Sequence, residues 1–324
     1  MTIQDVARKY AVAVSPHLVS LIDPADPHDP IARQFLPSLD ELVRLPDERA
    51  DPIGDAAHSP VTGIVHRHPD RVLFKAVAAC PVYCRFCFRR EMIGPGKPNA
   101  LPSHELDAAL AYIAAHPQIW EVILTGGDPF ILSPRRVAEI TQVLAAIPHV
   151  KVVRWHTRVP VTDPDRISDE FVAALHAPRA TTWVAVHANH PQEFAPEARR
   201  AIARLADAGI PLVSQSVLLR GVNDDVETLD SLMRLFVENR IKPYYLHHPD
   251  LAPGTSHFRL GIDEGLALVS ALRARLSGLA MPTYMLDIPG GFGKVPLESH
   301  NVERTATGHR IRDGRGVWHD YPVS

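Results

Sequence analysis

Residues 71–87 read Arg-Val-Leu-Phe-Lys-Ala-Val-Ala-Ala-Cys-Pro-Val-Tyr-Cys-Arg-Phe-Cys, a strand-like run that leads directly into three cysteines. Five more runs of this type follow, and after a first gap of about 50 residues their starts lie about 30 residues apart, the size of one strand–helix unit. The later runs begin at Glu121, Lys151, Thr181, Pro211 and Ile241. The spacing therefore predicts six repeats of a strand followed by a helix.

Helical patterns between these runs carry the expected start signals. Ser133 followed by Pro134 offers an N-cap and a first-turn proline, and Asp224 with Glu227 resembles a capping box. Alternating strands and helices predict a parallel sheet covered by helices, so the fold class is α/β. Because six units are too few for a complete eight-fold barrel, a partial barrel and an open doubly wound sheet both fit.

The two ends of the chain depart from this repeat. The first 65 residues are rich in proline and aspartate, which predicts an irregular cap with short helices. After Ser277 the pattern breaks again into a loop-rich tail. We therefore expect an N-terminal cap at residues 1–65, a barrel at residues 66–277 and a C-terminal segment at residues 278–324.

The composition of the 324 residues excludes several classes of protein. A net charge of −3 gives no electrostatic case for a nucleic-acid or membrane-surface partner. No run approaches 18 apolar residues, and the N-terminus carries charges where a signal peptide needs an apolar stretch, so we expect neither a membrane span nor secretion. All three cysteines lie within eight residues, which excludes a disulfide framework and indicates a reducing compartment, the cytoplasm.

Each predicted strand ends in a polar cluster. The carboxyl ends of parallel strands meet at one edge of a sheet, where barrels and open sheets build their active sites. One such cluster alone would mean little, because loops are usually polar, but six at corresponding positions indicate an enzyme. The clusters are Cys80, Thr125-Gly126-Gly127-Asp128, Trp155-His156-Thr157-Arg158, His187-Ala188-Asn189-His190, Ser214-Gln215-Ser216 and His247-His248-Pro249-Asp250.

The cysteines form the pattern Cys-x3-Cys-x2-Cys in one loop. Thiolates bind soft metals and iron–sulfur clusters, and a four-iron cluster with three protein thiolates leaves one iron open for chemistry. Cys84 and Cys87 alone would fit a dithiol redox pair, which leaves Cys80 unexplained. A zinc site would need a fourth ligand, which one of the 18 histidines could supply. The residue types therefore leave an iron–sulfur cluster and a zinc ion open.

The longer string Cys-Pro-Val-Tyr-Cys-Arg-Phe-Cys-Phe-Arg-Arg at residues 80–90 resembles the lysine 2,3-aminomutase family of radical S-adenosylmethionine enzymes. Further similarity covers nearly the whole chain, in HRHPDRVLF before the cysteines and in the later strings LTGGDP, QSVLLRGVND and DIPGGFGK. The resemblance implies a partial (β/α)6 TIM-like barrel with an N-terminal cap and a loop-rich C-terminal segment.

The resemblance also implies a metal cofactor. Cys80, Cys84 and Cys87 would be the protein ligands of a [4Fe-4S] cluster. The open iron of that cluster would bind S-adenosyl-L-methionine, and an electron from an external reductant would cleave it to a 5′-deoxyadenosyl radical. The residues expected to contact S-adenosyl-L-methionine are Gly126, Gly127 and Asp128, which resemble the loop that receives the methionyl amino group. Gln215 is also expected to bind a cofactor.

The glycine-rich stretch at residues 289–294 is not a phosphate loop, because Ile288 stands where the first glycine of that motif belongs and Val295 replaces its Ser or Thr. In the family that the chain resembles, the lysine that ends this stretch binds pyridoxal 5′-phosphate as a Schiff base. Lys294 is therefore the expected catalytic and cofactor-binding lysine. Arg71 matches the arginine that holds the cofactor phosphate, and His68 stands where relatives commonly have a tyrosine.

Three charged residues are expected to select the substrate. Arg89 aligns with the arginine that pairs with the substrate carboxylate, and a planar guanidinium suits such bidentate binding. Asp250 and Asp287 align with two aspartates that hold the distal ammonium of lysine, and glutamate-specific relatives would be expected to lose them. The resemblance thus predicts an isomerase that moves the α-amino group of L-lysine to the β-carbon and yields β-lysine.

Other functions fit parts of this pattern. A sister activity would supply β-lysine for the modification of elongation factor P, or would shift the amino group of another amino acid. A non-catalytic iron–sulfur module for electron transfer belongs to a different class, and it would make no use of Lys294, Arg89 or the two aspartates. The amino acid substrate and the reductant are the expected partners, and a homo-oligomer is compatible with the resemblance.

Overall fold

The computed structural model describes residues 2–94, 99–298 and 300–322. Within these residues the main sheet contains β1 (Ile64–His68), β2 (Arg71–Val77), β3 (Glu121–Gly126), β4 (Val152–Thr157), β5 (Thr181–His187), β6 (Leu212–Val217), β7 (Ile241–His247), β8 (Thr283–Ile288) and β9 (Gly293–Pro296). The strands lie side by side in chain order. Strands β2 to β8 pair in parallel, and β1 and β9 add to the two edges in antiparallel orientation.

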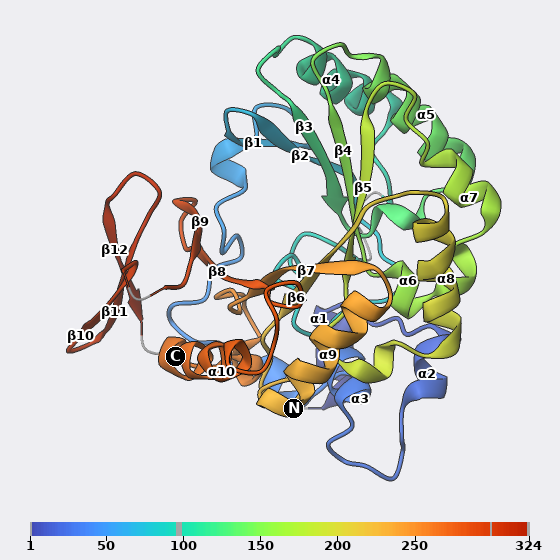
Figure 1. The fold of residues 1–324 in the computed structure, drawn as a ribbon. Coiled ribbons are helices and arrows are strands. Elements are labelled where there is room, and N and C mark those ends of the chain that lie inside the picture. Colours follow the sequence, from blue (N-terminus) through green and yellow to red (C-terminus); the bar gives the residue numbers. More distant parts are fainter. Residues whose placement is uncertain (1, 95–98, 299, 323–324) are drawn as a thin grey trace.

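Helices cover the outer face of this curved sheet (Figure 1). They are α4 (Ser103–Ala114), α5 (Pro134–Ala146), α7 (Asp169–Ala174), α8 (Pro196–Asp207), α9 (Val226–Glu238) and α10 (Ile262–Arg273). The connections contain the short helices η3 (Pro129–Ile131), α6 (Val159–Thr162), η4 (Pro164–Arg166), η5 (Pro191–Glu193) and η6 (Ser256–Phe258). In the core between sheet and helices, the Phe130 ring lies 4.7 Å from that of Phe171 and 6.0 Å from that of Trp155, by centroid. Burying each such side chain stabilises the fold by about 1.5–3 kcal/mol or more.

This arrangement confirms the predicted partial barrel. A doubly wound sheet reverses its strand order at a switch point, whereas consecutive strands here are always neighbours. The six predicted strands are present as β2 to β7. The sheet nevertheless extends past residue 277, the predicted end of the barrel, because β8 pairs with β7. The short run that forms β8 is followed at once by Pro289 and two glycines, so by sequence it resembles a loop.

The helix starts follow their capping residues. The Ser133 hydroxyl accepts a hydrogen bond from the backbone of Arg136, which confirms the predicted start of α5. The predicted capping box of α9 is one residue out of place, because Asp225 caps this helix through the backbone N–H of Thr228. The carboxylate of Asp224 instead accepts a hydrogen bond from the backbone N–H of Gly221. Of the two adjacent aspartates, Asp224 therefore stabilises a turn and Asp225 caps the helix.

The N-terminal segment is a cap of short helices, as predicted. Its elements are α1 (Ile3–Lys9), α2 (Pro16–Leu21), α3 (Pro30–Phe35), η1 (Leu39–Leu42) and η2 (Ala56–His58). Glu41 is completely buried and forms ion pairs with Arg85 and Arg90, which lie in and just after the cysteine loop. Glu48 forms a further buried ion pair with Arg259, which directly follows residues 256–258. The pairs of Glu41 join the cap to the loop that carries the cysteines, and the pair of Glu48 joins the cap to the segment after β7.

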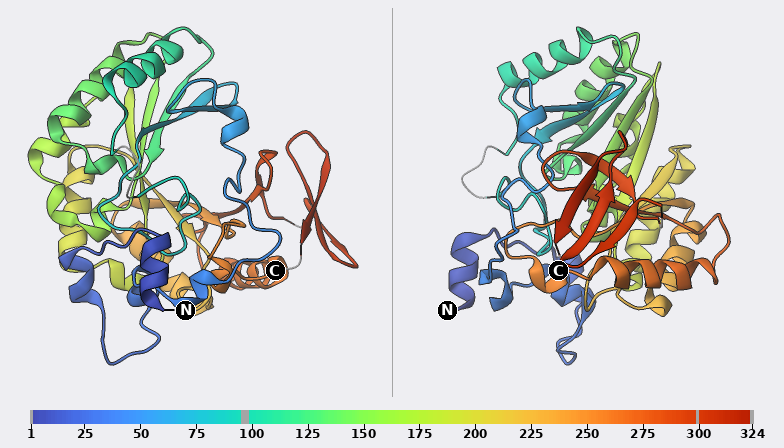
Figure 2. Two further views of the ribbon diagram at one scale, coloured as in Figure 1. Left: turned by 180° about the vertical axis from the view of Figure 1, so that it is seen from behind. Right: turned by 90° about the vertical axis from the view of Figure 1, so that its left-hand side faces the viewer.

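The chain ends in a feature that the sequence analysis did not predict, an antiparallel sheet of β10 (Val302–Thr305), β11 (Gly308–Arg312) and β12 (Trp318–Pro322). This sheet stands beside the barrel in the left view of Figure 2 and lies in front of it in the right view. Ile311 and Tyr321 are buried and pack onto the barrel core. Among the described residues, we find no helix that combines the length and the apolar character needed to cross a membrane.

Candidate active site

A cavity of about 620 Å³ is lined by residues from β1 to β9 and from the loops after them. Every site residue predicted from the sequence lines this cavity. These residues are Arg71, Cys80, Cys84, Cys87, Arg89, Gly126, Gly127, Asp128, Gln215, Asp250, Asp287 and Lys294. The fold therefore brings to one surface residues that are spread over more than 200 positions of the chain.

The two glycines after β3 position the cysteine loop. Gly126 has a φ of +114°, and a Cβ there would lie 2.2 Å from the carbonyl oxygen of Val77. A Cβ on Gly127 would lie 2.1 Å from the carbonyl oxygen of Ala79. Any larger residue would therefore push away the backbone that leads into Cys80. Close packing of two loops requires these glycines, whether or not a ligand also approaches them.

The three thiols are partly buried in the loop after β2. Burial raises the pKa of Cys80 well above its usual range and that of Cys87 to about 11. Metal binding would displace those protons. Among the described residues, no three His, Cys, Asp or Glu side chains are grouped closely enough to hold one metal ion.

Asp128 connects the loop after β3 to the end of β4. Its carboxylate accepts hydrogen bonds from the backbone N–H of Phe130 (3.0 Å), the hydroxyl of Thr157 (2.8 Å) and the backbone N–H of Arg158 (2.7 Å). Burial raises the pKa of Asp128, and these hydrogen bonds oppose that shift. The carboxylate already has three donors inside the protein, so its contact with a methionyl ammonium stays a prediction.

Lys294 on β9 lies directly opposite Asp287 on β8. Its ammonium forms an ion pair with that carboxylate and lies 3.3 Å from Nδ1 of His247. Burial, together with the charge of Lys294, lowers the pKa of His247 well below its usual range. The imidazole is therefore neutral, and its Nδ1 can accept a hydrogen bond. The amine thus contacts both a carboxylate and a neutral imidazole at the cavity wall.

Asp250 follows β7 and lines the same part of the cavity as Asp287. Burial and, to a smaller extent, the neighbouring Asp287 raise the pKa of Asp250 to about 7, although Lys294 and Arg89 oppose the shift. Two cations, Lys294 and Arg67, lie within ion-pair distance of Asp287. A further cation bound beside Asp250 would favour the ionised form of that carboxyl group.

Arg89 is buried beside the cysteine loop. Its guanidinium pairs with Asp55 (3.1 Å), donates a hydrogen bond to Thr125 (3.2 Å) and lies over the ring of Phe88. Its Nε is buried and has no hydrogen-bond partner among the described residues. Because a buried donor without a partner is costly, this atom is available for an anionic ligand such as a carboxylate.

Arg71 lies at the amino end of β2, at the opposite end of that strand from the cysteines. Its guanidinium pairs with Asp70 at 2.8 Å and is partly exposed. His68 lies nearby, where burial and the charges of Arg71 and Arg67 lower its pKa to about 4, so the ring is neutral. Arg67, which the sequence analysis did not single out, also lines the cavity and lies 3.9 Å from Asp287.

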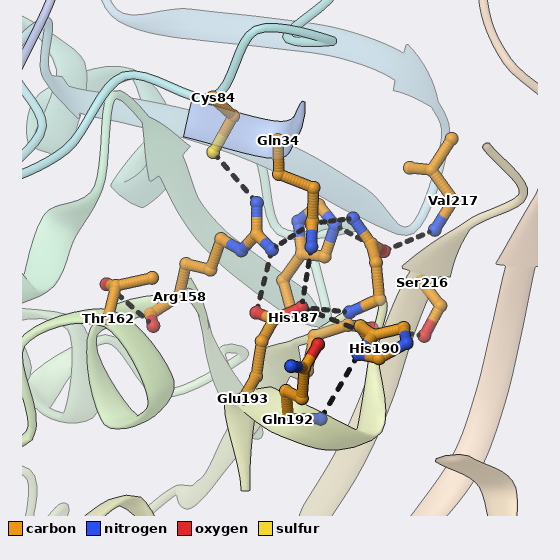
Figure 3. Close-up of polar contacts among 12 residues, drawn as sticks. Gln34, Cys84, Arg158, Thr162, His187, His190, Gln192, Glu193, Ser216 and Val217 are labelled. Atoms are coloured by element: carbon orange, nitrogen blue, oxygen red, sulfur yellow. Dashed lines mark hydrogen bonds and ion pairs between the residues drawn. The ribbon is translucent and has the colours of Figure 1, made fainter. Parts of the chain in front are cut away.

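Arg158, at the end of β4, is a further candidate that received no role from the sequence. It donates a hydrogen bond to Cys84 Sγ at 3.0 Å and pairs with Glu193 at 2.7 Å (Figure 3). The sequence offered one indication of a role for Arg158, which is its place in the polar cluster after the third predicted strand. The sequence could not indicate which of the charged residues in these clusters would point at a cysteine.

Comparison with known proteins adds the following similarities. Residues 75–233 match the radical SAM superfamily. The L-lysine 2,3-aminomutase of Fusobacterium nucleatum is 41% identical over 308 residues, which cover 94% of this chain and 72% of that protein. The L-lysine 2,3-aminomutase of Clostridium subterminale is 41% identical over 291 residues, covering 90% and 70%. The glutamate 2,3-aminomutase of Clostridioides difficile is 38% identical over 300 residues, covering 91% and 69%.

Proposed function

Because this chain belongs to the lysine 2,3-aminomutase family of radical S-adenosylmethionine enzymes, we propose that it moves the α-amino group of L-lysine to the β-carbon to give β-lysine. Family membership makes it an isomerase that acts on an amino acid with a [4Fe-4S] cluster and S-adenosylmethionine. Our proposal adds the use of pyridoxal 5′-phosphate, the choice of lysine and the roles of individual residues.

The cysteine loop fits a cluster with one open iron. Cys80, Cys84 and Cys87 would hold it, and the chemistry available there is the one-electron cleavage of S-adenosylmethionine to an adenosyl radical. Gly126 and Gly127 keep the loop close to β3, and Gln215 lines the adjoining wall of the cavity. The barrel surrounds this region and would limit the access of water, which would protect radicals from side reactions.

The surroundings of Lys294 fit pyridoxal 5′-phosphate. The Lys294 amine lies at the cavity wall, 3.3 Å from the neutral Nδ1 of His247, and would be the attachment point of the cofactor. The cationic Arg71 and Arg67 line the cavity and would hold the phosphate group. The cofactor would supply a covalent attachment point for the amino group and a conjugated system that stabilises a radical.

Charge at the cavity wall supports lysine as the substrate. Arg89, with its unpartnered Nε, would bind the substrate carboxylate. Asp250 and Asp287 would bind the distal ammonium, and the ion pair between Lys294 and Asp287 supports this role because it already joins a primary ammonium to that carboxylate. The distal carboxylate of glutamate would instead be repelled by these two acidic groups.

The observation that carries the proposal is the common cavity, which joins a three-cysteine loop, a lysine beside a neutral histidine, and a pair of carboxyl groups. The test is anaerobic purification, with iron, sulfide and pyridoxal counted. The protein is then assayed with reductant, S-adenosylmethionine and either lysine, arginine or glutamate. We expect all three cofactor components and turnover of lysine alone. Turnover of glutamate but not of lysine would refute the choice of substrate.

Two other functions give different results in the same experiment. An enzyme that supplies β-lysine for elongation factor P would also convert free lysine, so cells that lack the gene would separate it by the loss of that modification. A non-catalytic electron-transfer module would contain iron and sulfide but no pyridoxal, and it would convert none of the three amino acids.

A further inference from the structure

Arg158 is buried next to the cysteine loop in an environment that holds it in one place. Its side chain is only 6% exposed. The guanidinium carbon lies 4.7 Å from the ring centroid of Phe35 and 5.1 Å from that of Phe86. Phe35 comes from the N-terminal cap and Phe86 from the cysteine loop, so both segments enclose this cation. Stacking on aromatic rings restrains the plane of a guanidinium.

The guanidinium of Arg158 donates hydrogen bonds to a sulfur, a carboxylate and an amide oxygen (Figure 3). Nη1 donates to Cys84 Sγ at 3.0 Å. Nη2 donates to Glu193 Oε2 at 2.7 Å and to Gln34 Oε1 at 2.6 Å. One end of the guanidinium therefore points at a predicted cluster ligand, and the other is anchored to the protein.

Glu193 is itself immobilised. It is completely buried, and its Oε1 accepts hydrogen bonds from the backbone N–H groups of Asn189 (2.8 Å) and His190 (3.0 Å). These bonds use the loop after β5 to aim Oε2 at Arg158. The buried positive charge beside Cys84 is thus balanced by a negative charge whose position is fixed.

We propose that Arg158 raises the reduction potential of the iron–sulfur cluster through its hydrogen bond to Cys84, and that Glu193 limits this effect. A donor on a ligand sulfur, together with a nearby positive charge, stabilises the more negative, reduced cluster. The step concerned is the gain of one electron, which comes from the external reductant that the proposed function already requires. Arg158 is in this sense a positioning and tuning residue rather than a catalytic one.

This inference rests on the proposed cluster at Cys80, Cys84 and Cys87. It is tested on the holoenzyme by an anaerobic redox titration, without S-adenosylmethionine, followed by electron paramagnetic resonance of the reduced cluster. Iron and sulfide are counted in every sample. Absence of a cluster from the wild-type protein would refute the proposed function, whereas an intact cluster with an unchanged potential in the variants would refute only this inference.

The variants Arg158→Met and Glu193→Gln give opposite predictions. The first removes the donor and leaves an unbalanced negative charge, so the potential should fall by about 59 mV, which is a tenfold loss in the one-electron equilibrium. The second leaves Arg158 unbalanced, so the potential should rise. Arg200→Met removes a cation from an exposed ion pair on α8, and it should leave the potential unchanged.

Opposite shifts in the two variants would support the proposal, because structural damage from either substitution would not reverse its sign. Shifts in the same direction, or no shift, would overturn it. If Arg158→Met yields no cluster, a raised potential in Glu193→Gln alone still supports it, and an unchanged or lowered one overturns it. Loss of the cluster from both variants would also overturn it, since the pair would then hold the cluster instead of tuning it.

Discussion

Lysine binding should depend on pH through Asp250. Burial raises the pKa of this carboxyl group to about 7, whereas an ordinary aspartate, at 3.8, is ionised throughout the neutral range. Because the shifted group is an acid, its negative charge appears as the pH rises through 7. The distal ammonium of lysine remains charged up to about pH 10, so only the protein side of this contact changes.

The size of the effect follows from the ionised fraction. With a pKa of about 7, about one Asp250 in eleven is ionised at pH 6 and about ten in eleven are ionised at pH 8. If only the ionised form binds lysine well, the apparent affinity scales with that fraction. The KM for lysine should therefore be about tenfold higher at pH 6 than at pH 8.

The assay measures initial rates of β-lysine formation over this pH range, with the other components at saturating concentrations. Asp250→Asn should abolish the pH step and raise the KM at pH 8 by about 30-fold or more, since truncating one partner of a buried charge pair costs about 2–5 kcal/mol. Asp263→Asn, a change of the same kind at the surface of α10, should behave as wild type. A KM that stays flat in the wild type, or a pH step that survives in Asp250→Asn, would refute the reasoning.

Further predictions concern cofactor retention and stability. Lys294→Ala should lose the visible absorbance band of bound pyridoxal while keeping its iron, whereas the control Lys242→Ala should keep both; a band of wild-type intensity in Lys294→Ala would contradict the assignment. Glu41→Gln breaks the two buried ion pairs of Glu41, so the free energy of unfolding, measured with denaturant, should fall by about 3–5 kcal/mol. A fall below about 1 kcal/mol would show that these ion pairs stabilise the protein little. Gly126→Ala would place a Cβ 2.2 Å from the carbonyl oxygen of Val77, so the purified protein should contain less iron; a full complement would show that the loop adapts.

The local features of this fold could be predicted because they depend on neighbouring residues. Strand-forming runs, turn residues and N-caps act over a few positions, so β2 to β7 and the start of α5 follow from the sequence. The spacing of Cys80, Cys84 and Cys87 likewise indicates a metal cofactor within one loop. The resemblance to a family then predicted that Arg89 binds the substrate carboxylate, and Arg89 lies at the common cavity.

Long-range contacts could not be predicted in this way. The sequence of β8 resembles a loop, and this segment is a strand because its backbone forms hydrogen bonds with β7. Such bonds join residues that are distant in the sequence and meet only in the folded chain. The pKa of Asp250 depends on burial and on Asp287, neither of which is visible at its own position in the sequence. Arg158 stands 74 residues from Cys84, and only the curvature of the barrel brings its guanidinium to that sulfur. The sequence by itself determined which chemical groups this protein carries, and the tertiary structure decided which of them meet, because charge, burial and hydrogen bonding act through space.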